Sequence, residues 1–144
     1  MIEVKNLVKE FKTEDGTFRA IDDLSFKVNR GEIYGVIGLS GAGKSTLVRC
    51  INRLEEPTSG EIIVDGKSII NLNEKELRAA RKDIGMIFQY FNLFMQKTVA
   101  ENIAYPLLIS GVSRADIEKR VDELLNFIDL KNKKNSYPSE LSGG

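Results

Sequence analysis

One stretch constrains this chain more than any other, and it runs from Gly38 to Thr46. It reads Gly-Leu-Ser-Gly-Ala-Gly-Lys-Ser-Thr and matches the phosphate-binding loop pattern G-x-x-x-x-G-K-[ST] in full. Residues 32–37 before it predict a buried strand, and residues 46–53 after it predict a helix. In that context the backbone N–H groups of the loop and the helix N-terminus can surround a phosphate group.

The residue types inside the loop predict its chemistry. Its glycines let a phosphate approach the backbone, Lys44 would reach the β- and γ-phosphates, and the Ser45 hydroxyl would ligate Mg²⁺. A plain glycine turn with an incidental Lys-Ser pair is the alternative. The nucleotide-binding residues expected in this stretch are Gly38, Leu39, Ser40, Gly41, Ala42, Gly43, Lys44, Ser45 and Thr46.

Composition excludes several classes of function. The chain of 144 residues has 21 Lys and Arg against 21 Asp and Glu, which argues against a general nucleic-acid binder. It has no histidine, so histidine acid–base chemistry and histidine metal sites are excluded within it. The single cysteine, Cys50, falls on an apolar helix face and is expected to be buried. No apolar run reaches the roughly 20 residues of a membrane-spanning helix, and no signal peptide is recognisable, so we expect a cytoplasmic protein.

Hydrophobic periodicity predicts a β-rich beginning. Strands are expected over residues 2–7, 18–21 and 24–28, with a turn at 13–17, and their short connections favour antiparallel pairing. A further short strand is expected over residues 61–64. Residues 84–88 form an apolar run that predicts another buried strand, and Gln89 follows it directly.

The remainder of the chain predicts helices. Asn73 is the expected N-cap of a helix through Arg81, and Ser113 that of a helix over residues 114–128. A third helix is expected from Thr98, which Pro106 should kink or end. The apolar positions expected to face the core of these last two helices are Val99, Ile103, Leu107 and Leu108, and then Ile117, Val121, Leu124, Leu125 and Ile128.

The last four residues, Leu141-Ser142-Gly143-Gly144, resemble the L-S-G-G-Q signature of the ATP-binding-cassette (ABC) ATPases, broken off before its glutamine. They follow a phosphate loop, an apolar run ending in glutamine and a helical insert, in the order of that family. Within it, the chain looks most like the ATP-binding subunits of bacterial methionine importers, on residues 33–38, 40–47, 49–52, 84–89, 91–93, 102–104 and 106–107.

The resemblance implies an α/β fold of the P-loop NTPase type. An ABC nucleotide-binding domain would have an N-terminal antiparallel β subdomain, a partial parallel core sheet and a helical insert. We expect residues 1–144 to be the N-terminal part of one such domain. Residues 1–30 would form the antiparallel region, 31–90 the phosphate-loop core, and 91–144 the helical subdomain up to the signature motif.

The resemblance also assigns site residues. Gln89 would be the glutamine that coordinates Mg²⁺ or holds the attacking water, so Lys44 and Gln89 are the expected catalytic residues and Ser45 and Gln89 the expected Mg²⁺ ligands. Phe11 would stack on the adenine ring, with Phe18 as the alternate; a core role is the other interpretation of Phe11. The signature residues Ser142, Gly143 and Gly144 would act in trans, on the ATP held by a second, head-to-tail copy.

The implied function is that of an ATP-hydrolysing importer subunit, at the cytoplasmic face of the membrane, which couples ATP binding and hydrolysis to amino-acid uptake, with methionine as the expected solute. The segment from Tyr90 to Lys97 would contact the transmembrane permease subunits, unless it folds back onto its own core. An extracytoplasmic substrate-binding protein would be an indirect partner. The alternatives are a polar-amino-acid importer subunit, a soluble ABC ATPase not tied to transport, and a non-catalytic nucleotide-binding piece. A GTPase is disfavoured, because residues 132–135 lack the final aspartate of N-K-x-D.

The resemblance runs out at Gly144. The signature glutamine, the aspartate-glutamate strand end and the switch histidine of the family are not present in this sequence. We therefore expect the 144-residue chain by itself to be inactive in ATP hydrolysis. We also expect it to fold incompletely or to rely on oligomerisation, because the parallel neighbours of the phosphate-loop strand are missing.

Overall fold

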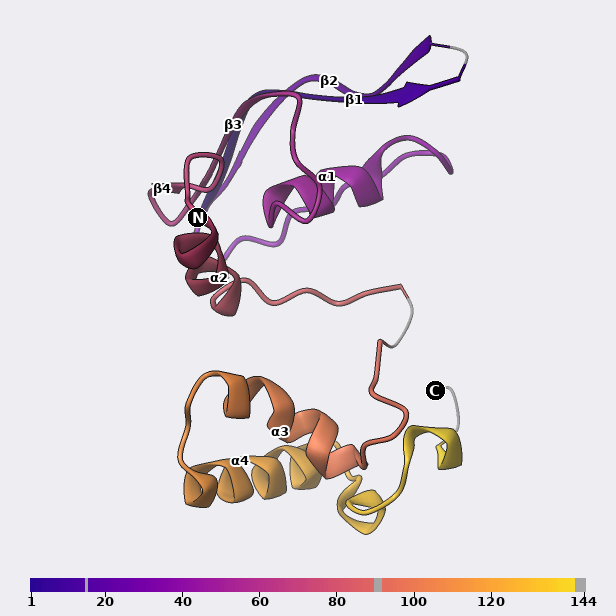
Figure 1. Ribbon diagram of the computed structural model, residues 1–144, viewed down its shortest axis with the longest axis vertical. Coiled ribbons are helices and arrows are strands. Elements are labelled where there is room, and N and C mark those ends of the chain that lie inside the picture. Colours follow the sequence, from indigo (N-terminus) through magenta and orange to yellow (C-terminus); the bar gives the residue numbers. More distant parts are fainter. Residues whose placement is uncertain (15, 90–91, 142–144) are drawn as a thin grey trace. The chain divides into compact units, whose positions relative to one another are not determined.

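The computed structural model describes residues 1–14, 16–89 and 92–141, and the chain divides into two compact units, Met1–Gly85 and Met86–Gly144 (Figure 1). The first unit contains β1 (Ile2–Thr13), β2 (Gly16–Val28), α1 (Lys44–Ile51), β3 (Ser59–Val64), β4 (Lys67–Ser68) and α2 (Glu74–Lys82). The second contains α3 (Val99–Ile109), α4 (Arg114–Phe127) and 3₁₀ turns over Lys131–Lys133 and Pro138–Glu140.

Over the described residues, the sheet of the first unit has the strand order β2-β1-β3-β4, and every pairing is antiparallel. The expected antiparallel beginning is therefore confirmed. The strands expected over residues 18–21 and 24–28 are one strand, β2, which pairs with β1 from Ile2↔Val28 to Thr13↔Gly16. Register shifts between Val4 and Glu10 bend β1, as bulges do.

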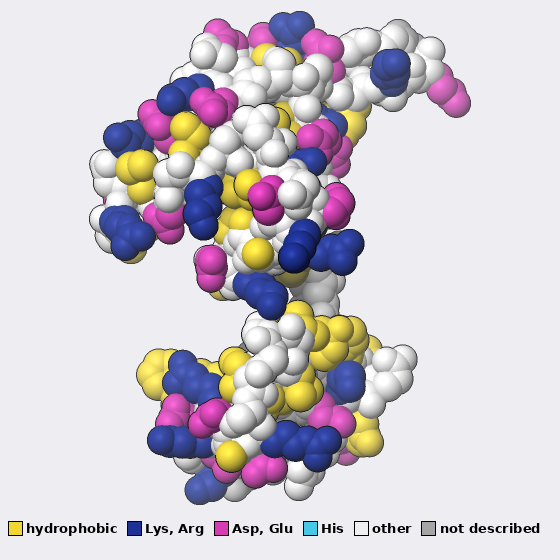
Figure 2. All heavy atoms as spheres, turned by 60° about the vertical axis from the view of Figure 1, so that its left-hand side comes forward, with side chains coloured by type: hydrophobic (Ala, Val, Ile, Leu, Met, Phe, Trp, Pro, Cys, Tyr) yellow, Lys and Arg dark blue, Asp and Glu magenta, His cyan; other side chains and the backbone are white. Residues whose placement is uncertain are grey.

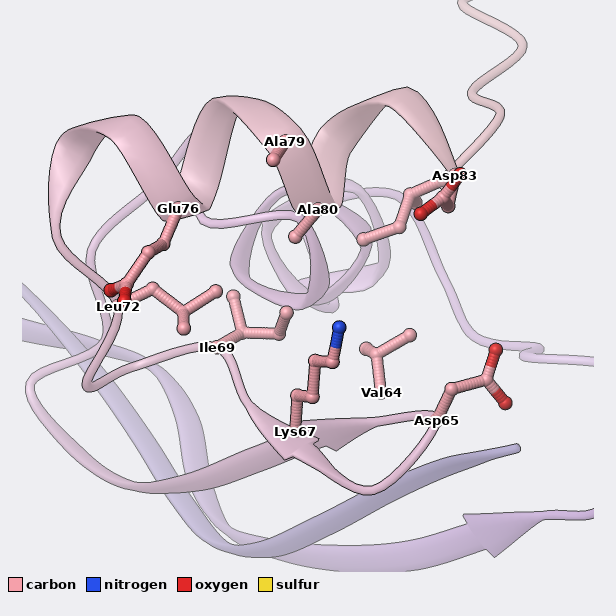
Figure 3. A pocket seen from close by; sticks show the side chains of 10 residues that line it. Val64, Asp65, Lys67, Ile69, Leu72, Glu76, Ala79, Ala80 and Asp83 are labelled. Carbon is pink, nitrogen blue, oxygen red and sulfur yellow. The ribbon is translucent and has the colours of Figure 1, made fainter.

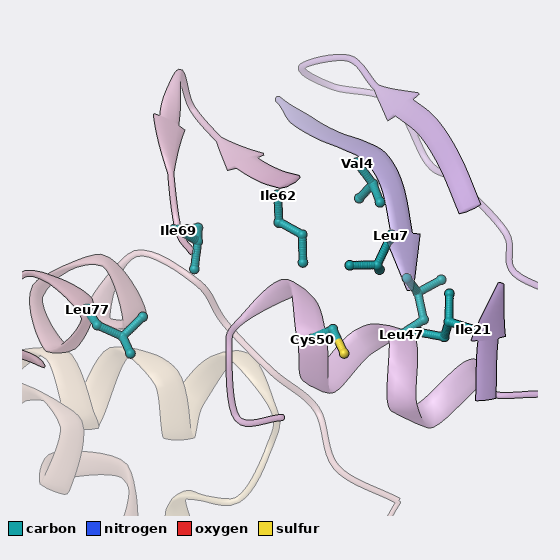
Figure 4. Close-up of a cluster of buried hydrophobic side chains, with 8 residues drawn as sticks. All are labelled: Val4, Leu7, Ile21, Leu47, Cys50, Ile62, Ile69 and Leu77. Carbon is teal, nitrogen blue, oxygen red and sulfur yellow. The ribbon is translucent and has the colours of Figure 1, made fainter. Parts of the chain in front are cut away.

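Helix α1 packs its apolar face on this sheet and closes a hydrophobic core (Figure 4). Leu47 and Cys50 come from the helix, and Cys50 is fully buried, as its position in the apolar pattern predicts. The buried members of the core are Val4, Leu7, Ile21, Leu47, Cys50, Ile62, Ile69 and Leu77. The core thus holds the helix that follows the phosphate loop against β1 and β2.

The prediction of a buried strand over residues 32–37 is wrong for this chain. The segment is extended but belongs to no sheet, and Ile33 and Ile37 are 99% and 95% exposed. Its other face does pack: the Tyr34 ring stacks on Phe26, with centroids 5.1 Å apart. An apolar strand becomes buried only when neighbouring strands and a covering layer flank it, and the described residues supply neither on the outer face.

The second expected buried strand, over residues 84–88, is also not formed. No residue of it is in a strand in the described structure, and Ile87 is completely exposed. The same physical reason applies, because this apolar run has no strand beside it among the described residues. The antiparallel part of the expected architecture is present, whereas the parallel pairing is not seen within the described ranges.

The second unit is a helical hairpin whose helix starts follow the sequence signals. Thr98 caps α3 with a reciprocal capping box to Glu101, and the Ser113 side chain caps α4. The helices bury Val99 against a stripe on α4 made of Ile117, Val121 and Leu125.

Helix α3 runs on past Pro106 to Ile109, so of the two expected effects of the proline, a kink or an end, the end is excluded. Two further expectations for this hairpin need correction. Leu108 is exposed, because nine residues on from Val99 a helix has turned it about 180° away from the buried face. Ile128 is exposed because α4 ends at Phe127, and the helical spacing no longer applies to the residue after it.

Candidate functional site

The phosphate loop leads directly into the first turn of α1. Gly41 and Gly43 both have φ of +82°, a left-handed conformation that glycine adopts without strain. Gly43 is the N-cap residue, and in the described structure no side chain caps the helix and no acidic residue lies in its first turn. The N–H groups at this end of α1 are therefore not occupied by a capping side chain, and the helix dipole favours an anion there.

The loop backbone lies directly against β2. A Cβ atom added at Gly43 would be only 2.3 Å from the carbonyl oxygen of Ala20, which is closer than any real contact allows. A Cβ atom at Gly38 would lie 3.1 Å from the Ala42 side chain. Only a glycine at position 43 lets the loop approach the strand this closely. The contact with β2 therefore sets how close the loop backbone lies to the sheet.

Lys44 folds back over the loop that precedes it. Its Nζ donates hydrogen bonds to the carbonyl oxygens of Gly38 at 2.8 Å and Leu39 at 2.7 Å. The ammonium group is thus held at the loop, where a phosphate oxygen would be a stronger, charged acceptor than either carbonyl. Ser45 follows on the first turn of α1 and is exposed.

A cavity of about 270 Å³ lies between β2 and the loop. Gly43 and Lys44 form part of one wall, and Asp22 adds a carboxylate. The other lining residues are Ala20, Ile21, Leu24, Val36, Ile37, Ala42 and Leu47. The mostly apolar lining indicates that the phosphate-binding groups are those of the loop itself.

The side chains present suit a Mg²⁺ ion only if a bound phosphate group supplies further ligands. Among the described residues no group of three or more His, Cys, Asp or Glu side chains could hold a metal ion. The exposed Ser45 hydroxyl at the start of α1 supplies one hard oxygen ligand. Mg²⁺ commonly takes one or two protein ligands and completes its shell with waters and substrate phosphates, which suits this site.

The predicted site residues are divided between the two units or lie outside the described residues. Gln89 is exposed and belongs to the second unit, whereas the phosphate loop belongs to the first. Tyr90, Ser142, Gly143 and Gly144 lie outside the described residues, and so does Phe91.

The described part of the segment after Gln89 exposes apolar side chains. Leu93, Phe94 and Met95 are all exposed, and hydrophobic side chains gather on the helical unit in Figure 2. The segment is anchored at Phe94, whose backbone N–H donates to the Asn102 side chain at 2.8 Å and whose ring lies 4.6 Å from that of Tyr105.

Phe11 lies in the first unit, on β1, opposite Phe18 on β2. It is half-buried, and Phe18 is exposed. The Nζ of Lys9 sits over the Phe11 ring, 4.6 Å from its centroid. Sequence reasoning missed Lys9; the signal that could have found it is its spacing of two residues from the core residue Leu7, which places both on one face of the strand.

A second cavity, of about 350 Å³, lies between α2 and the β3–β4 hairpin (Figure 3). Its lining is partly apolar and includes Ile69, Leu72 and Ala80; the Lys67 side chain extends towards α2 between Ile69 and Val64, and Asp83 lies to one side. None of the site residues predicted from the sequence lines it.

Comparisons with known proteins show the family to which the chain belongs. The ABC transporter family model matches residues 21–144, and the chain belongs to that family. A dimeric structure of the ATP-binding cassette MJ0796, described as a post-hydrolysis state bound to ADP and Pi, superimposes with a TM-score of 0.90 at 34% identity, over 99% of this chain and 64% of that one. The α/β fold of the ABC nucleotide-binding domain is thereby confirmed.

Curated relatives are more specific. The chain is 54% identical to methionine import ATP-binding protein MetN 1 of Bacillus cereus, over all of its 144 residues and 42% of that protein. It is 52% identical to MetN of Halalkalibacterium halodurans, over 43% of that protein. The chain therefore spans less than half the length of these relatives. In the described ranges, no helix combines the length and the apolar character needed to cross a membrane.

Proposed function

We propose that this chain is the nucleotide-gripping part of the ATP-binding subunit of an importer for methionine. The observation that carries the proposal is its 54% identity, over the full 144 residues, to a protein described as a methionine import ATP-binding protein. The loop geometry supports nucleotide binding independently, because Lys44 Nζ is held at the Gly38 carbonyl and no side chain caps the start of α1.

In this proposal the loop binds the triphosphate of ATP. Lys44 exchanges its bonds to the Gly38 and Leu39 carbonyls for bonds to the β- and γ-phosphates, and the N–H groups of α1 face the same anion. Ser45 would hold a Mg²⁺ ion that accompanies the phosphates, with Gln89 as the further ligand expected from the family. When bound, the ion neutralises charge that develops on the phosphates.

The metal role of Ser45 has a direct test. Ser45→Ala should weaken ATP binding severalfold when Mg²⁺ is present and leave it unchanged in excess EDTA, as measured by calorimetry. Because Ser45 is exposed, the substitution should not disturb the core. Equal weakening with and without Mg²⁺ would refute metal ligation by this residue.

Hydrolysis and transport belong to the whole protein. Lys44 and Gln89 would act as catalytic residues, while Ser142, Gly143 and Gly144 would close over the ATP of a second copy packed head to tail. The structural relative MJ0796 is described as dimeric, which supports this arrangement. The subunit would sit at the cytoplasmic face of the membrane and receive the solute signal only indirectly, from the substrate-binding protein through the permease.

The exposed apolar side chains of residues 93–95 support docking to the permease. Co-purification with the permease subunits of a methionine importer, compared with those of a polar-amino-acid importer, tests the partner. Selective capture by the methionine permease is expected. Selective capture by the other permease would replace methionine by a polar amino acid, and capture by neither would favour a soluble ABC ATPase.

A further inference from the structure

Lys9 is a cation inside the first unit that the phosphate-binding chemistry leaves unexplained. It lies on β1 between bulges and is almost completely buried, with a side chain only 11% exposed. Charged side chains are seldom this buried without a partner, because desolvation of the charge is costly. Its contacts therefore indicate what the charge is used for.

Three groups surround its ammonium. The Glu55 carboxylate lies 2.7 Å away, and Lys9 donates a hydrogen bond to the carbonyl oxygen of Glu56 at 2.8 Å. The third is the Phe11 ring, whose centroid is 4.6 Å from Nζ, within the range of a cation–π interaction. Both glutamates follow the C-terminal end of α1, so Lys9 ties the ring to the segment behind the phosphate-binding helix.

Through β2, Phe11 is also connected to the N-terminal end of α1, where the phosphate loop leads into the helix. It pairs with Phe18, and Phe18 is two residues along the strand from Ala20, the residue whose carbonyl is in close contact with Gly43. Two residues of a strand span about 7 Å. The Phe11 ring therefore lies a short distance along the sheet from the phosphate loop. It is carried by the pair of strands β1 and β2, and β2 is the strand that contacts the loop.

We propose that Lys9 is a positioning residue of the nucleotide site: its ammonium group, held by Glu55 and the Glu56 carbonyl, fixes the Phe11 ring in the orientation that stacks on the nucleotide base. This rests on the proposed ATP binding and on base stacking by Phe11. Phe11 is half-buried, so part of its ring surface is open, and the Lys9 ammonium lies over one face of the ring. In the proposal the base stacks on the other face. A ring fixed before binding loses less conformational freedom when the base arrives.

The experiment compares a ligand that has a base with one that has none. Calorimetry with Mg²⁺ and either ATP or tripolyphosphate is run on the wild-type chain, Lys9→Met, Lys9→Arg, Phe11→Ala and the double variant. Lys9→Met keeps length and volume but removes the charge. Lys5→Met is the matched control, because Lys5 is an exposed cation of the same strand, near Glu3 at 3.4 Å and Glu61 at 4.0 Å.

We expect Lys9→Met to weaken ATP binding about fivefold and to leave tripolyphosphate binding within about twofold of wild type. Lys9→Arg, which keeps the charge, should bind both ligands nearly as wild type does, and so should Lys5→Met. The double variant should bind ATP no more weakly than Phe11→Ala alone, because the lysine acts through the ring. Should Lys9→Met not fold, Glu55→Gln tests the same link by loosening the hold on Lys9, and a smaller ATP-only loss is expected.

Several results would overturn the proposal. Equal weakening of ATP and tripolyphosphate in Lys9→Met would show a purely structural role, and unchanged ATP binding would show none. Losses that add fully in the double variant would separate Lys9 from the ring. Wild type that binds tripolyphosphate and ATP equally well would refute base stacking and this inference, and wild type that binds neither would refute the proposed function itself.

Discussion

Two glycines of the phosphate loop have the same backbone conformation but different surroundings, and that difference predicts unequal effects of alanine. Gly41 and Gly43 both have φ of +82°, where a residue with a side chain is strained by about 1–2 kcal/mol. At Gly41 no described atom lies within 4 Å of an added Cβ, so this strain is the whole cost of Gly41→Ala.

At Gly43 the added Cβ would be 2.3 Å from the Ala20 carbonyl oxygen, an atom of the sheet backbone that cannot rotate away. Forcing an extra methyl group into a packed position costs a further 1–3 kcal/mol or so. Gly43→Ala should therefore destabilise the first unit by about 2–5 kcal/mol, against about 1–2 kcal/mol for Gly41→Ala.

The assay is urea-induced unfolding of both variants and wild type, followed by circular dichroism, with the slope against urea fitted for each protein. The expected result is a lower free energy of unfolding for Gly43→Ala than for Gly41→Ala at unchanged slope. Equal destabilisation by the two substitutions would refute the contact between the loop and β2, because their backbone strain is the same.

Three further predictions concern other parts of the chain. Burial raises the pKa of the Cys50 thiol from 9.0 to about 11. At pH 8 a disulfide reagent should therefore modify the folded chain at least about a hundredfold more slowly than the chain in urea. Equal rates would contradict the burial of this thiol. Thr98→Ala removes the N-cap of α3 and should cost about 1 kcal/mol in urea unfolding of the helical unit, whereas no change would show that the cap is dispensable. The hydrogen bond from the Met1 ammonium, with the charge of Arg30, lowers the pKa of Asp65 below 3.8. Its stabilising effect should be complete above that pH and lost as the pH falls through the lower folded value. A wild-type minus Asp65→Asn difference in stability that does not shrink as the pH falls below 3.8 would contradict this.

Local features of this fold could be predicted from the sequence. The caps at Asn73, Thr98 and Ser113 depend on side chains that bond to backbone groups two or three residues away, so their sequence signals are sufficient. The antiparallel pairing of β1 with β2 needs only a short turn, and the apolar face of α1 needs only helical spacing.

Features that depend on distant partners could not be predicted. Residues 32–37 and 84–88 have the composition of buried strands, but a strand forms only when another strand lies beside it, and composition does not say whether one does. The apolar pattern predicts that Leu108 and Ile128 are buried. In the structure both are exposed, because Leu108 lies on the side of α3 opposite Val99 and Ile128 follows the last residue of α4.

In the candidate site, too, some features follow from a local sequence pattern and others depend on distant segments. The residue types and spacing of the phosphate loop are enough to predict an anion site, because its chemistry resides in nine consecutive residues. The close contact of Gly43 with Ala20, and the ties from Lys9 to Phe11 and Glu55, join segments far apart in the chain. No local pattern predicts them.

The central claim is that this chain holds the triphosphate of ATP through Lys44, and calorimetric titration with ATP in Mg²⁺ tests it most directly. Wild type should bind, and Lys44→Ala should bind about 10- to 100-fold more weakly, which corresponds to the loss of charge-assisted hydrogen bonds. Lys5→Met, which removes an exposed charge far along the sequence, should bind as wild type does. Wild type that does not bind ATP, or Lys44→Ala that binds with unchanged affinity, would contradict the account.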